Sequence, residues 1–375
     1  MVKPTSEWVM DTVAQTFAPP PRIGMVGGGF MARTHTRAAR AAGAQLRVIA
    51  TSSAAGSRRA AAELGYEAAA NGEDLFDHDL DVVHVCTPNS THAEHSLRAL
   101  DAGSNIICEK PLATDASAAA AIRDRAKSLG LGGTVPFVYR YHPMVREARA
   151  RIRRGDAGTL LTVDASYLQD WLLSAEDENW RVDASSGGPS RAFADIGSHL
   201  VDLIEFITGE HIMSVVATTR TVHPRRGGAE VTTEDTVAMT VELSGGGIGS
   251  ILVSQLAPGR KNRLVIEVGG SKESLRFAQE QPEQLWVGRR VGSQLLDRDP
   301  DALSPDAARL CTVPPGHPQG YQDAFNAFIA DSYAVFAGEV REGVPTLDDG
   351  VRAALVTEAV LRSAADRSWV EVEAR

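Results

Sequence analysis

The lysine at position 110 stands where an apolar strand would be expected simply to end. Residues 105–108 read Asn-Ile-Ile-Cys, a short buried strand, and Glu109, Lys110 and Pro111 follow at once. The chain takes most of its positive charge from Arg, so a Lys at a strand end favours a titratable amine, which Arg cannot supply. One interpretation is a surface ion pair between Glu109 and Lys110. The other is a catalytic cleft at the end of the strand, in which Lys110 takes part in the reaction.

Asp195 and His199 form a second candidate pair. They lie four residues apart where a helix is predicted over 196–208, so both side chains fall on one face, within reach of each other or of a shared substrate. The same helix has an apolar side, and a histidine on such a helix is often structural. The neighbouring carboxylate favours chemistry instead. Asp195 would orient the imidazole and stabilise its charged form, while His199 would exchange a proton.

Glycines follow the first predicted strand, residues 22–26. The run Gly27-x-Gly29-x-x-Ala32 stands between this strand and a helix, where glycines permit a tight turn and let the helix N-terminus face a pyrophosphate. The alternative is a purely structural turn. Its place on the first strand of an α/β domain favours dinucleotide binding, with Phe30 and Met31 also beside the cofactor.

The second predicted strand, residues 46–50, ends without the acidic residue that usually binds the ribose 2′-hydroxyl. Hydroxyl groups and arginines follow it instead: Thr51, Ser52, Ser53, Arg58 and Arg59. These groups could bind a 2′-phosphate, unless the arginines are solvated helix residues. We therefore expect NAD or NADP as the cofactor, with a slight preference for NADP, and Ser52 in contact with it.

Strands and helices alternate from residue 22 to about residue 140, and then the pattern changes. Near-continuous apolar strands alternating with helices indicate a doubly wound parallel sheet, a Rossmann domain. The later strands alternate in polarity between Gly-rich turns, which indicates an α+β domain with a large, open antiparallel sheet. Strands are predicted at 22–26, 46–50, 81–88, 105–109 and 133–139, then at 159–171, 212–221, 235–244, 247–256, 263–270, 274–278 and 284–288. We expect an N-terminal extension (1–21), a Rossmann domain (22–140) and a second domain (141–375).

Composition excludes several classes of protein. At 375 residues the chain is long enough for two domains. A net charge of −10 without a basic stripe argues against nucleic-acid binding, and the chain has no apolar run of about 20 residues to cross a membrane. Cys86, Cys108 and Cys311 have no metal-binding spacing and cannot all pair, so we expect a cytoplasmic protein without a metal site.

Together, these motifs resemble the Gfo/Idh/MocA family, named after glucose–fructose oxidoreductase, inositol dehydrogenase and rhizopine catabolism. The motifs occur in the order Gly27-x-Gly29-x-x-Ala32, Thr87-Pro88-Asn89 with His92, Glu109-Lys110-Pro111, and Asp195-x-x-x-His199. The resemblance covers nearly everything from residue 22 to the end. The loop of Thr87, Pro88, Asn89 and His92 follows a strand, so it should lie on the nicotinamide side of the crevice, as should Glu109.

The resemblance implies an NAD(P)-dependent enzyme that oxidises a secondary hydroxyl of a sugar, glycoside or cyclitol. It also implies that Lys110 and His199 flank the reacting carbon, in roles that could be exchanged, with Asp195 beside them. In relatives the open sheet usually forms a dimer or tetramer interface, so we expect a homodimer or homotetramer. The alternatives are a non-catalytic dinucleotide or sugar sensor of the same fold, or an interaction protein. The presence of both Lys110 and His199 favours the enzyme.

Polar and aromatic residues that suit a polyol gather in two further segments. Aromatic faces pack on a sugar ring while polar groups meet its hydroxyls. The alternative for Trp171 and Trp180 is a place in the core. The predicted substrate-binding residues are Tyr139, Arg140, Gln169, Asp170, Trp171, Trp180 and Arg181.

Overall fold

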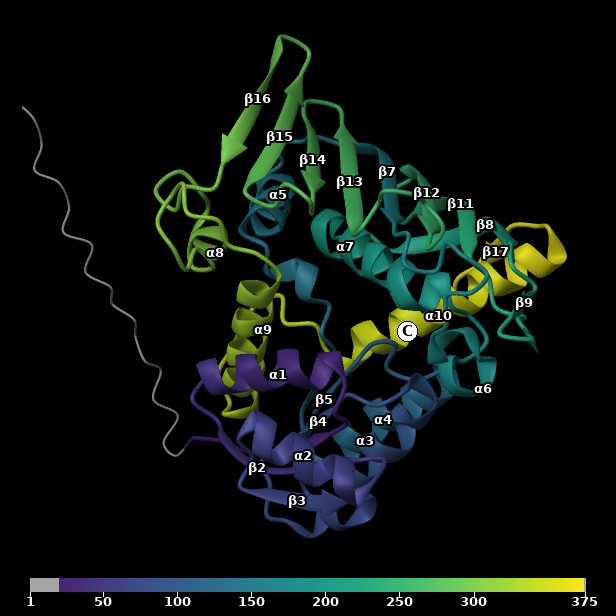
Figure 1. Ribbon diagram of the computed structural model, residues 1–375. Helices are drawn as coiled ribbons and strands as arrows, with labels where there is room; N and C mark the ends of the chain where they lie inside the picture. The colour runs from purple at the N-terminus through teal and green to yellow at the C-terminus, as the bar shows by residue number, and fades with distance from the viewer. Residues whose placement is uncertain (1–19, 374–375) are drawn as a thin grey trace, which may run out of the picture.

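The computed structural model describes residues 20–373, which form two domains with a cavity between them (Figure 1). The predicted N-terminal extension, residues 1–21, lies almost entirely outside this range. Among residues 20–373, no helix is both long enough and apolar enough to span a bilayer.

The N-terminal domain is built on a parallel six-stranded sheet in the order β3-β2-β1-β4-β5-β6. The strand order reverses between β1 and β4, which opens a crevice at the carboxyl ends of these strands. The elements are β1 (Arg22–Val26), α1 (Phe30–Ala41), β2 (Gln45–Thr51), α2 (Ala54–Leu64), β3 (Ala68–Asn71), η1 (Gly72–Asp77), β4 (Val82–Val85), η2 (Asn89–Thr91), α3 (His92–Asp101), β5 (Asn105–Cys108), α4 (Ala116–Leu129), β6 (Gly133–Thr134) and η3 (Val138–Tyr141).

Some strand boundaries differ from the predicted ones. The strand predicted over 81–88 ends at Val85, and the one predicted over 133–139 is only β6, after which the chain turns into η3. Edge strand β3, Ala68–Asn71, was not predicted, because a run of alanines has little β-propensity.

The C-terminal domain contains a nine-stranded sheet in the order β16-β15-β14-β13-β7-β12-β11-β8-β17. The sequence predicted an antiparallel sheet, but the sheet is mixed, because the neighbours β7 and β12 run parallel. Its strands are β7 (Leu160–Leu168), β8 (Ile212–Arg220), β11 (Thr236–Leu243), β12 (Ile248–Ser254), β13 (Arg263–Gly270), β14 (Ser274–Ala278), β15 (Gln284–Arg289), β16 (Gly292–Asp297) and β17 (Val370–Glu371), and a separate hairpin is formed by β9 (Arg225–Arg226) and β10 (Ala229–Glu230).

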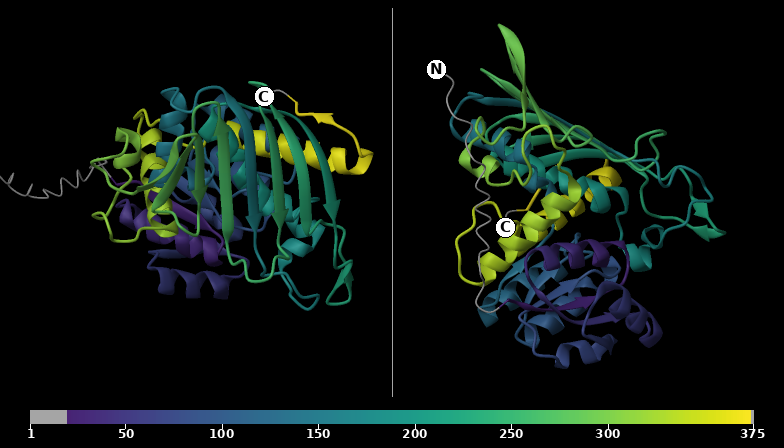
Figure 2. Two further views of the ribbon diagram at one scale, coloured as in Figure 1. Left: turned by 90° about the horizontal axis from the view of Figure 1, so that it is seen from above. Right: turned by 60° about the vertical axis from the view of Figure 1, so that its left-hand side comes forward.

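Helices cover one face of the large sheet, and the other face is open (Figure 2). Along β11 buried and exposed side chains alternate, as expected when only one face of a strand is covered. Apolar side chains of Leu161, Ile248 and Leu252 remain exposed on neighbouring strands β7 and β12. The helical elements of this domain are α5 (Pro143–Arg153), η4 (Trp180–Val182), α6 (Ala184–Gly187), η5 (Phe193–Gly197), α7 (Ser198–Thr208), α8 (Pro305–Ala308), α9 (Tyr321–Phe336) and α10 (Leu347–Asp366).

The last two long helices join the domains. Helix α9 packs against α1, and its Phe325 and Phe328 share a buried cluster with Ile23 and Ile49 of the N-terminal sheet. Helix α10 contacts both α4 of the N-terminal domain and β8 of the large sheet. The cavity between the domains therefore has walls that are fixed by shared core packing.

Candidate active site

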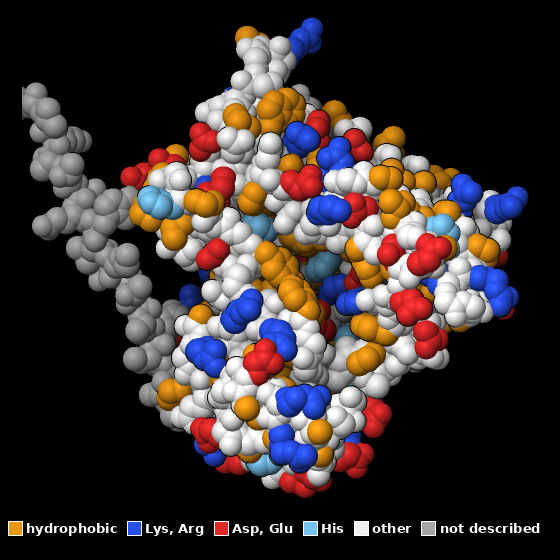
Figure 3. Space-filling view, viewed as in Figure 1, with side chains coloured by type: hydrophobic (Ala, Val, Ile, Leu, Met, Phe, Trp, Pro, Cys, Tyr) orange, Lys and Arg blue, Asp and Glu red, His pale blue; other side chains and the backbone are white. Residues whose placement is uncertain are grey.

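A cavity of about 1620 Å³ lies at the carboxyl ends of β1, β4 and β5 and extends toward the large sheet. In the space-filling view the surface is hollowed between the two domains (Figure 3). Nearly all the residues predicted to form the site line this cavity: Gly27, Gly29, Phe30, Met31, Ser52, Thr87, Pro88, Asn89, His92, Glu109, Lys110, Tyr139, Gln169, Trp171, Trp180, Arg181, Asp195 and His199.

The glycine turn after β1 suits a phosphate group. Gly27 has φ +117°, and a Cβ there would lie 2.2 Å from the carbonyl oxygen of Cys86, so only glycine fits. A Cβ on Gly29 would meet nothing within 4 Å. Among the described residues, no side chain caps the N-terminus of α1, and its first turn has no acid. The main-chain N–H groups in the first turn of α1 can therefore face a pyrophosphate, as the sequence predicted.

The end of β2 offers hydroxyl groups and a guanidinium group to the cavity. Thr51, Ser52 and Arg59 line it, whereas Arg58 is not among the lining residues. The guanidinium of Arg33 also lines the cavity and is paired with the carboxylate of Glu63, at 2.9 Å between Nη2 and Oε2.

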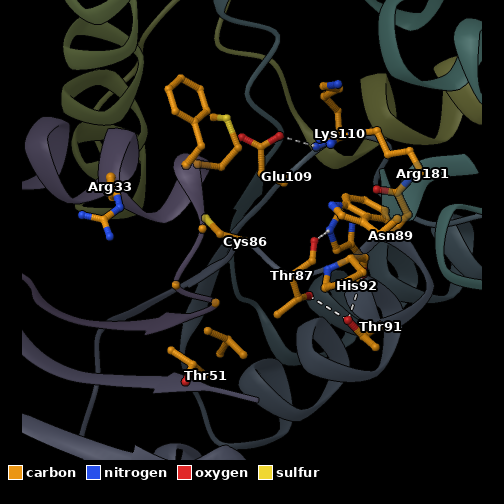
Figure 4. A pocket seen from close by; sticks show the side chains of 18 of the residues that line it. Arg33, Thr51, Cys86, Thr87, Asn89, Thr91, His92, Glu109, Lys110 and Arg181 are labelled. Atoms are coloured by element: carbon orange, nitrogen blue, oxygen red, sulfur yellow. Dashed lines mark hydrogen bonds between the residues drawn. The ribbon is translucent and has the colours of Figure 1, made fainter. Parts of the chain in front are cut away.

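The loop after β4 is fixed by hydrogen bonds (Figure 4). The ring nitrogens of buried His92 lie 2.7 Å from the carbonyl oxygen of Pro111 and 2.9 Å from that of Thr87, so this side chain joins the loops that follow β4 and β5. Burial lowers the pKa of His92. Asn89 donates a hydrogen bond of 2.9 Å from Nδ2 to the carbonyl of Gly187, which connects the cofactor side of the cavity to the second domain.

Glu109 does not form the ion pair with the Lys110 side chain that one interpretation of the sequence predicted. Its Oε1 lies 3.0 Å from Nε2 of His35, and its Oε2 accepts a hydrogen bond of 3.1 Å from the main-chain N–H of Lys110. Nδ1 of His35 lies 2.9 Å from Nδ1 of His84, whose Nε2 lies 2.8 Å from the hydroxyl of Tyr333. Burial alone would raise the pKa of Glu109, but His35 and the charge of Lys110 bring it below its usual value.

The Lys110 side chain binds Asp195 instead. Its Nζ donates hydrogen bonds to the main-chain carbonyl (2.7 Å) and to Oδ1 (2.8 Å) of Asp195. Oδ2 of Asp195 accepts a hydrogen bond of 2.9 Å from Gln255, and Nε of Arg181 lies 3.3 Å from Oδ1. Burial opposes ionisation of Asp195, yet the charges of Lys110 and Arg181 outweigh it and lower the pKa to about 2. Asp195 is therefore a carboxylate held between two cations.

His199 lies on α7, beside this pair, and its side chain faces the same cavity. The prediction that Asp195 orients the imidazole is wrong in one respect: the carboxylate binds Lys110 and Gln255, and the buried Nδ1 of His199 has no hydrogen-bond partner among residues 20–373. The ring packs edge-on against Tyr139, with centroids 5.0 Å apart. Burial, and then the charge of Lys110, lower the pKa of His199 well below its usual value, so the imidazole is neutral at pH 7.

A network of hydrogen bonds lines the end of the cavity nearest the large sheet. The hydroxyls of Tyr139 and Tyr167 lie 2.6 Å apart, and that of Tyr167 donates to Oδ1 of Asn262 at 2.6 Å. Gln169 donates to the same Oδ1 at 2.8 Å and accepts a hydrogen bond of 2.8 Å from Nε1 of Trp171. These side chains present aromatic faces and polar groups together, which is the combination a polyol requires.

Two residues predicted to bind the substrate do not line the cavity. The guanidinium of Arg140 is buried and pairs with Asp202, at 2.8 Å between Nε and Oδ2, and with Asp349 at 3.1 Å. Asp170 pairs with Lys261 at 2.8 Å. Trp171 and Trp180 do line the cavity and are partly exposed, so the alternative that they belong to the core is wrong.

Several lining residues were not predicted to form the site. Tyr167 lies on β7 with its side chain toward the covered face, a position that alternation along the strand could have indicated. Asn262 precedes β13 and gives no signal in the sequence, since an Asn beside a Gly-Arg-Lys run reads as a turn. The lining residues that were not predicted include Tyr167, Asn179, Asn262, Tyr321 and Phe325.

Comparison with known proteins finds similarity over both domains. Residues 21–135 match the family model described as an oxidoreductase family with an NAD-binding Rossmann fold, and residues 145–276 match the GFO/IDH/MocA C-terminal domain. Levoglucosan dehydrogenase of Pseudarthrobacter phenanthrenivorans is 30% identical, over 93% of this chain and 97% of its own.

Solved structures resemble this one over almost the whole chain. A levoglucosan dehydrogenase in complex with NADH and levoglucosan superposes with a TM-score of 0.88 and 30% identity, over 95% of this chain and 100% of the other. An oxidoreductase domain protein from Kribbella flavida has a TM-score of 0.87 and 32% identity, over the same shares of the two chains. Two matching domains, the dinucleotide turn and the Lys110 cavity together lead to one conclusion: the chain belongs to the Gfo/Idh/MocA family of NAD-binding oxidoreductases.

Proposed function

We propose that the protein is an NAD(P)-dependent dehydrogenase that oxidises a secondary hydroxyl of a sugar, glycoside or cyclitol. The observation that carries the proposal is the meeting of Lys110, Asp195 and His199 in the cavity that begins at the glycine turn. The similarity to levoglucosan dehydrogenase supports a sugar as the substrate class. A bound nicotinamide would supply the hydride acceptor in this cavity.

In the proposed reaction His199 removes the hydroxyl proton and Lys110 stabilises the oxygen. A base must be unprotonated to accept a proton, and burial keeps His199 neutral at pH 7. The Lys110 ammonium, held at 2.8 Å by the Asp195 carboxylate, would donate a hydrogen bond to the same substrate oxygen as negative charge develops there. Asp195 thus positions Lys110, rather than the imidazole.

The proposed substrate contacts lie on both sides of this pair. Tyr139, Gln169, Trp171 and Arg181 line the cavity near Asp195 and His199 and would meet the sugar ring and its hydroxyls. For the cofactor, we propose that Arg59 and the hydroxyls at the end of β2 accept NADP as well as NAD, with a modest preference for NADP.

We also propose that the protein is a cytoplasmic homodimer or homotetramer that assembles through the open face of the large sheet. The exposed apolar side chains of Leu161, Ile248 and Leu252 on that face support this proposal, because large apolar patches on a surface mark contact sites. Buried free thiols at Cys86 and Cys108 suit a reducing compartment.

The test is a panel of sugars, glycosides and cyclitols incubated with NAD or NADP, followed by nicotinamide absorbance. We expect at least one sugar to be oxidised, and Lys110→Met to abolish most of the turnover. If calorimetry detects binding of cofactor and sugar but no member of the panel is oxidised, the sensor alternative is correct and the proposal fails.

A further inference from the structure

The loop between β7 and α6 carries several of the residues that would contact the sugar. Trp171, Asn179, Trp180 and Arg181 all line the cavity, and Arg181 reaches Asp195. Residues 169–179, all of them within the described range, contain no helix or strand, and only the short turn η4 follows. Something outside the loop must therefore fix its position.

The guanidinium of Arg226 makes most of the contacts that do so, and Nε2 of His223 lies 2.9 Å from the carbonyl oxygen of Leu173. Arg226 lies on β9, in the hairpin that projects from the second domain (Figure 2), and its side chain is 3% exposed. It donates hydrogen bonds to the main-chain carbonyls of Leu172 (2.7 Å), Asp177 (3.1 Å) and Ser174. One planar, forked side chain thus binds three carbonyls of the loop, an arrangement that a single ammonium group cannot reproduce.

The charges around Arg226 explain why these carbonyls are needed. Two buried guanidinium groups, those of Arg191 and Arg226, share the carboxylate of Asp235, which lies 3.5 Å from Nη2 of Arg226 and closer to Arg191. The neighbouring carboxylate of Glu234 is occupied by Ser190 and by main-chain N–H groups. A buried charge must be paired or hydrogen-bonded, and the loop carbonyls accept the hydrogen bonds of both terminal nitrogens of Arg226, while its Nε has no partner among residues 20–373.

We propose that Arg226 is a positioning residue for the sugar: it holds residues 172–177 in place so that Trp171, Trp180 and Arg181 keep their positions in the cavity. This inference rests on the proposed function for its kinetic consequence. Arg226 is not a lining residue of the cavity formed by residues 20–373, and the cofactor turn lies on the other domain. Its loss therefore weakens sugar binding and leaves cofactor binding unchanged.

The test compares Arg226→Gln with Arg225→Gln in the full-length protein. Arg225 is the adjacent residue of β9, is exposed, and donates to the carbonyl of Gly228 within the hairpin, so it is a matched control. Hydrogen–deuterium exchange should show faster exchange of residues 171–182 in Arg226→Gln alone. The KM for the sugar should rise about tenfold or more, because hydrogen bonds to a charged group hold the loop, while kcat changes less and the Kd for cofactor stays the same.

Arg226→Lys keeps the buried charge without the fork, so we expect intermediate exchange and an intermediate KM; it replaces the Gln variant if that one fails to fold. Unchanged exchange in residues 171–182 would overturn the proposal, as would equal effects of the Arg225 and Arg226 substitutions. The exchange measurement needs no sugar. A failure of the proposed function, seen as wild-type protein that oxidises no sugar, is therefore distinguishable from a failure of this inference.

Discussion

Replacing Lys110 with methionine removes the ammonium but keeps a side chain of similar length at the end of β5. In the structure Nζ of Lys110 donates to the carbonyl and carboxylate of Asp195, and the same charge lowers the pKa of His199. Two effects should follow: loss of the group that stabilises the developing alkoxide, and a rise in the pKa of His199. Asp195 still has Gln255 and Arg181 as partners, so we expect the variant to fold.

The magnitude follows from the role of a charged donor at a reacting oxygen. Loss of such a donor or of an acid–base group lowers turnover by roughly 10²–10⁴-fold. This corresponds to about 3–5 kcal/mol of transition-state stabilisation. The pH profile changes in a defined direction. His199 must be neutral to accept a proton, so as its pKa rises without the Lys110 charge, the acid limb of kcat/KM moves to higher pH.

The assay is nicotinamide absorbance with the best sugar of the panel, measured across pH for wild type and Lys110→Met, with cofactor Kd from calorimetry. Lys261→Met is the matched control: its side chain is 81% exposed, pairs with Asp170 and lies outside the cavity lining. We expect control activity and pH profile to equal those of wild type. If Lys110→Met turns over within tenfold of wild type, Lys110 serves only to anchor Asp195, and the catalytic argument is refuted.

Further substitutions test other parts of the site. His199→Ala should bind cofactor normally yet lose roughly 10²–10⁴-fold in turnover, because the proton acceptor is gone; near-normal turnover would assign that role elsewhere. Arg59→Ala should weaken NADP binding more than NAD binding by calorimetry, and an equal loss of both would refute a 2′-phosphate contact. Arg140→Ala should lower the free energy of unfolding by about 3–5 kcal/mol in urea titrations, since it leaves the buried Asp202 carboxylate without its partner, and a change under 1 kcal/mol would contradict this. Trp171→Ala should raise the KM for the sugar without changing the cofactor Kd. An unchanged KM would show that the ring makes no sugar contact.

Local sequence determined what could be predicted. The glycine turn, the loop after β4 and Lys110 each follow a strand directly, so an alternation of strands and helices is enough to bring them to one edge of the parallel sheet. The spacing of Asp195 and His199 placed both on one face of a helix, and the resemblance to the family placed them beside Lys110. Long-range pairing was less accessible: polarity alternation along β7 and β12 shows which face is covered, but not that these two strands are parallel neighbours.

Arg140 shows why some predictions failed. An arginine after a strand end, beside a tyrosine, fits a polyol site as well as it fits an ion pair. Its partners, Asp202 and Asp349, lie on α7 and α10, which only the tertiary fold brings to it. Asn262 was not predicted as a lining residue, because its sequence context indicates only a turn. Its side chain accepts the hydrogen bond from Tyr167 only because pairing of β7 with β13 places the two residues side by side.

The wide turn η5, Phe193–Gly197, is a π-helical segment in which the N–H of Ser198 bonds to the carbonyl of Phe193, five residues back. Such turns contain one residue more than an α-helical turn, and they are frequent at functional sites. The relative orientation of Asp195 and His199 therefore depends on the number of residues between Phe193 and α7, and not only on their identities. Deleting one residue here would restore α-helical register, rotate the following helix by about 100° and carry His199 away from Lys110. A single-codon deletion would thus inactivate the site while every catalytic side chain remained in the chain.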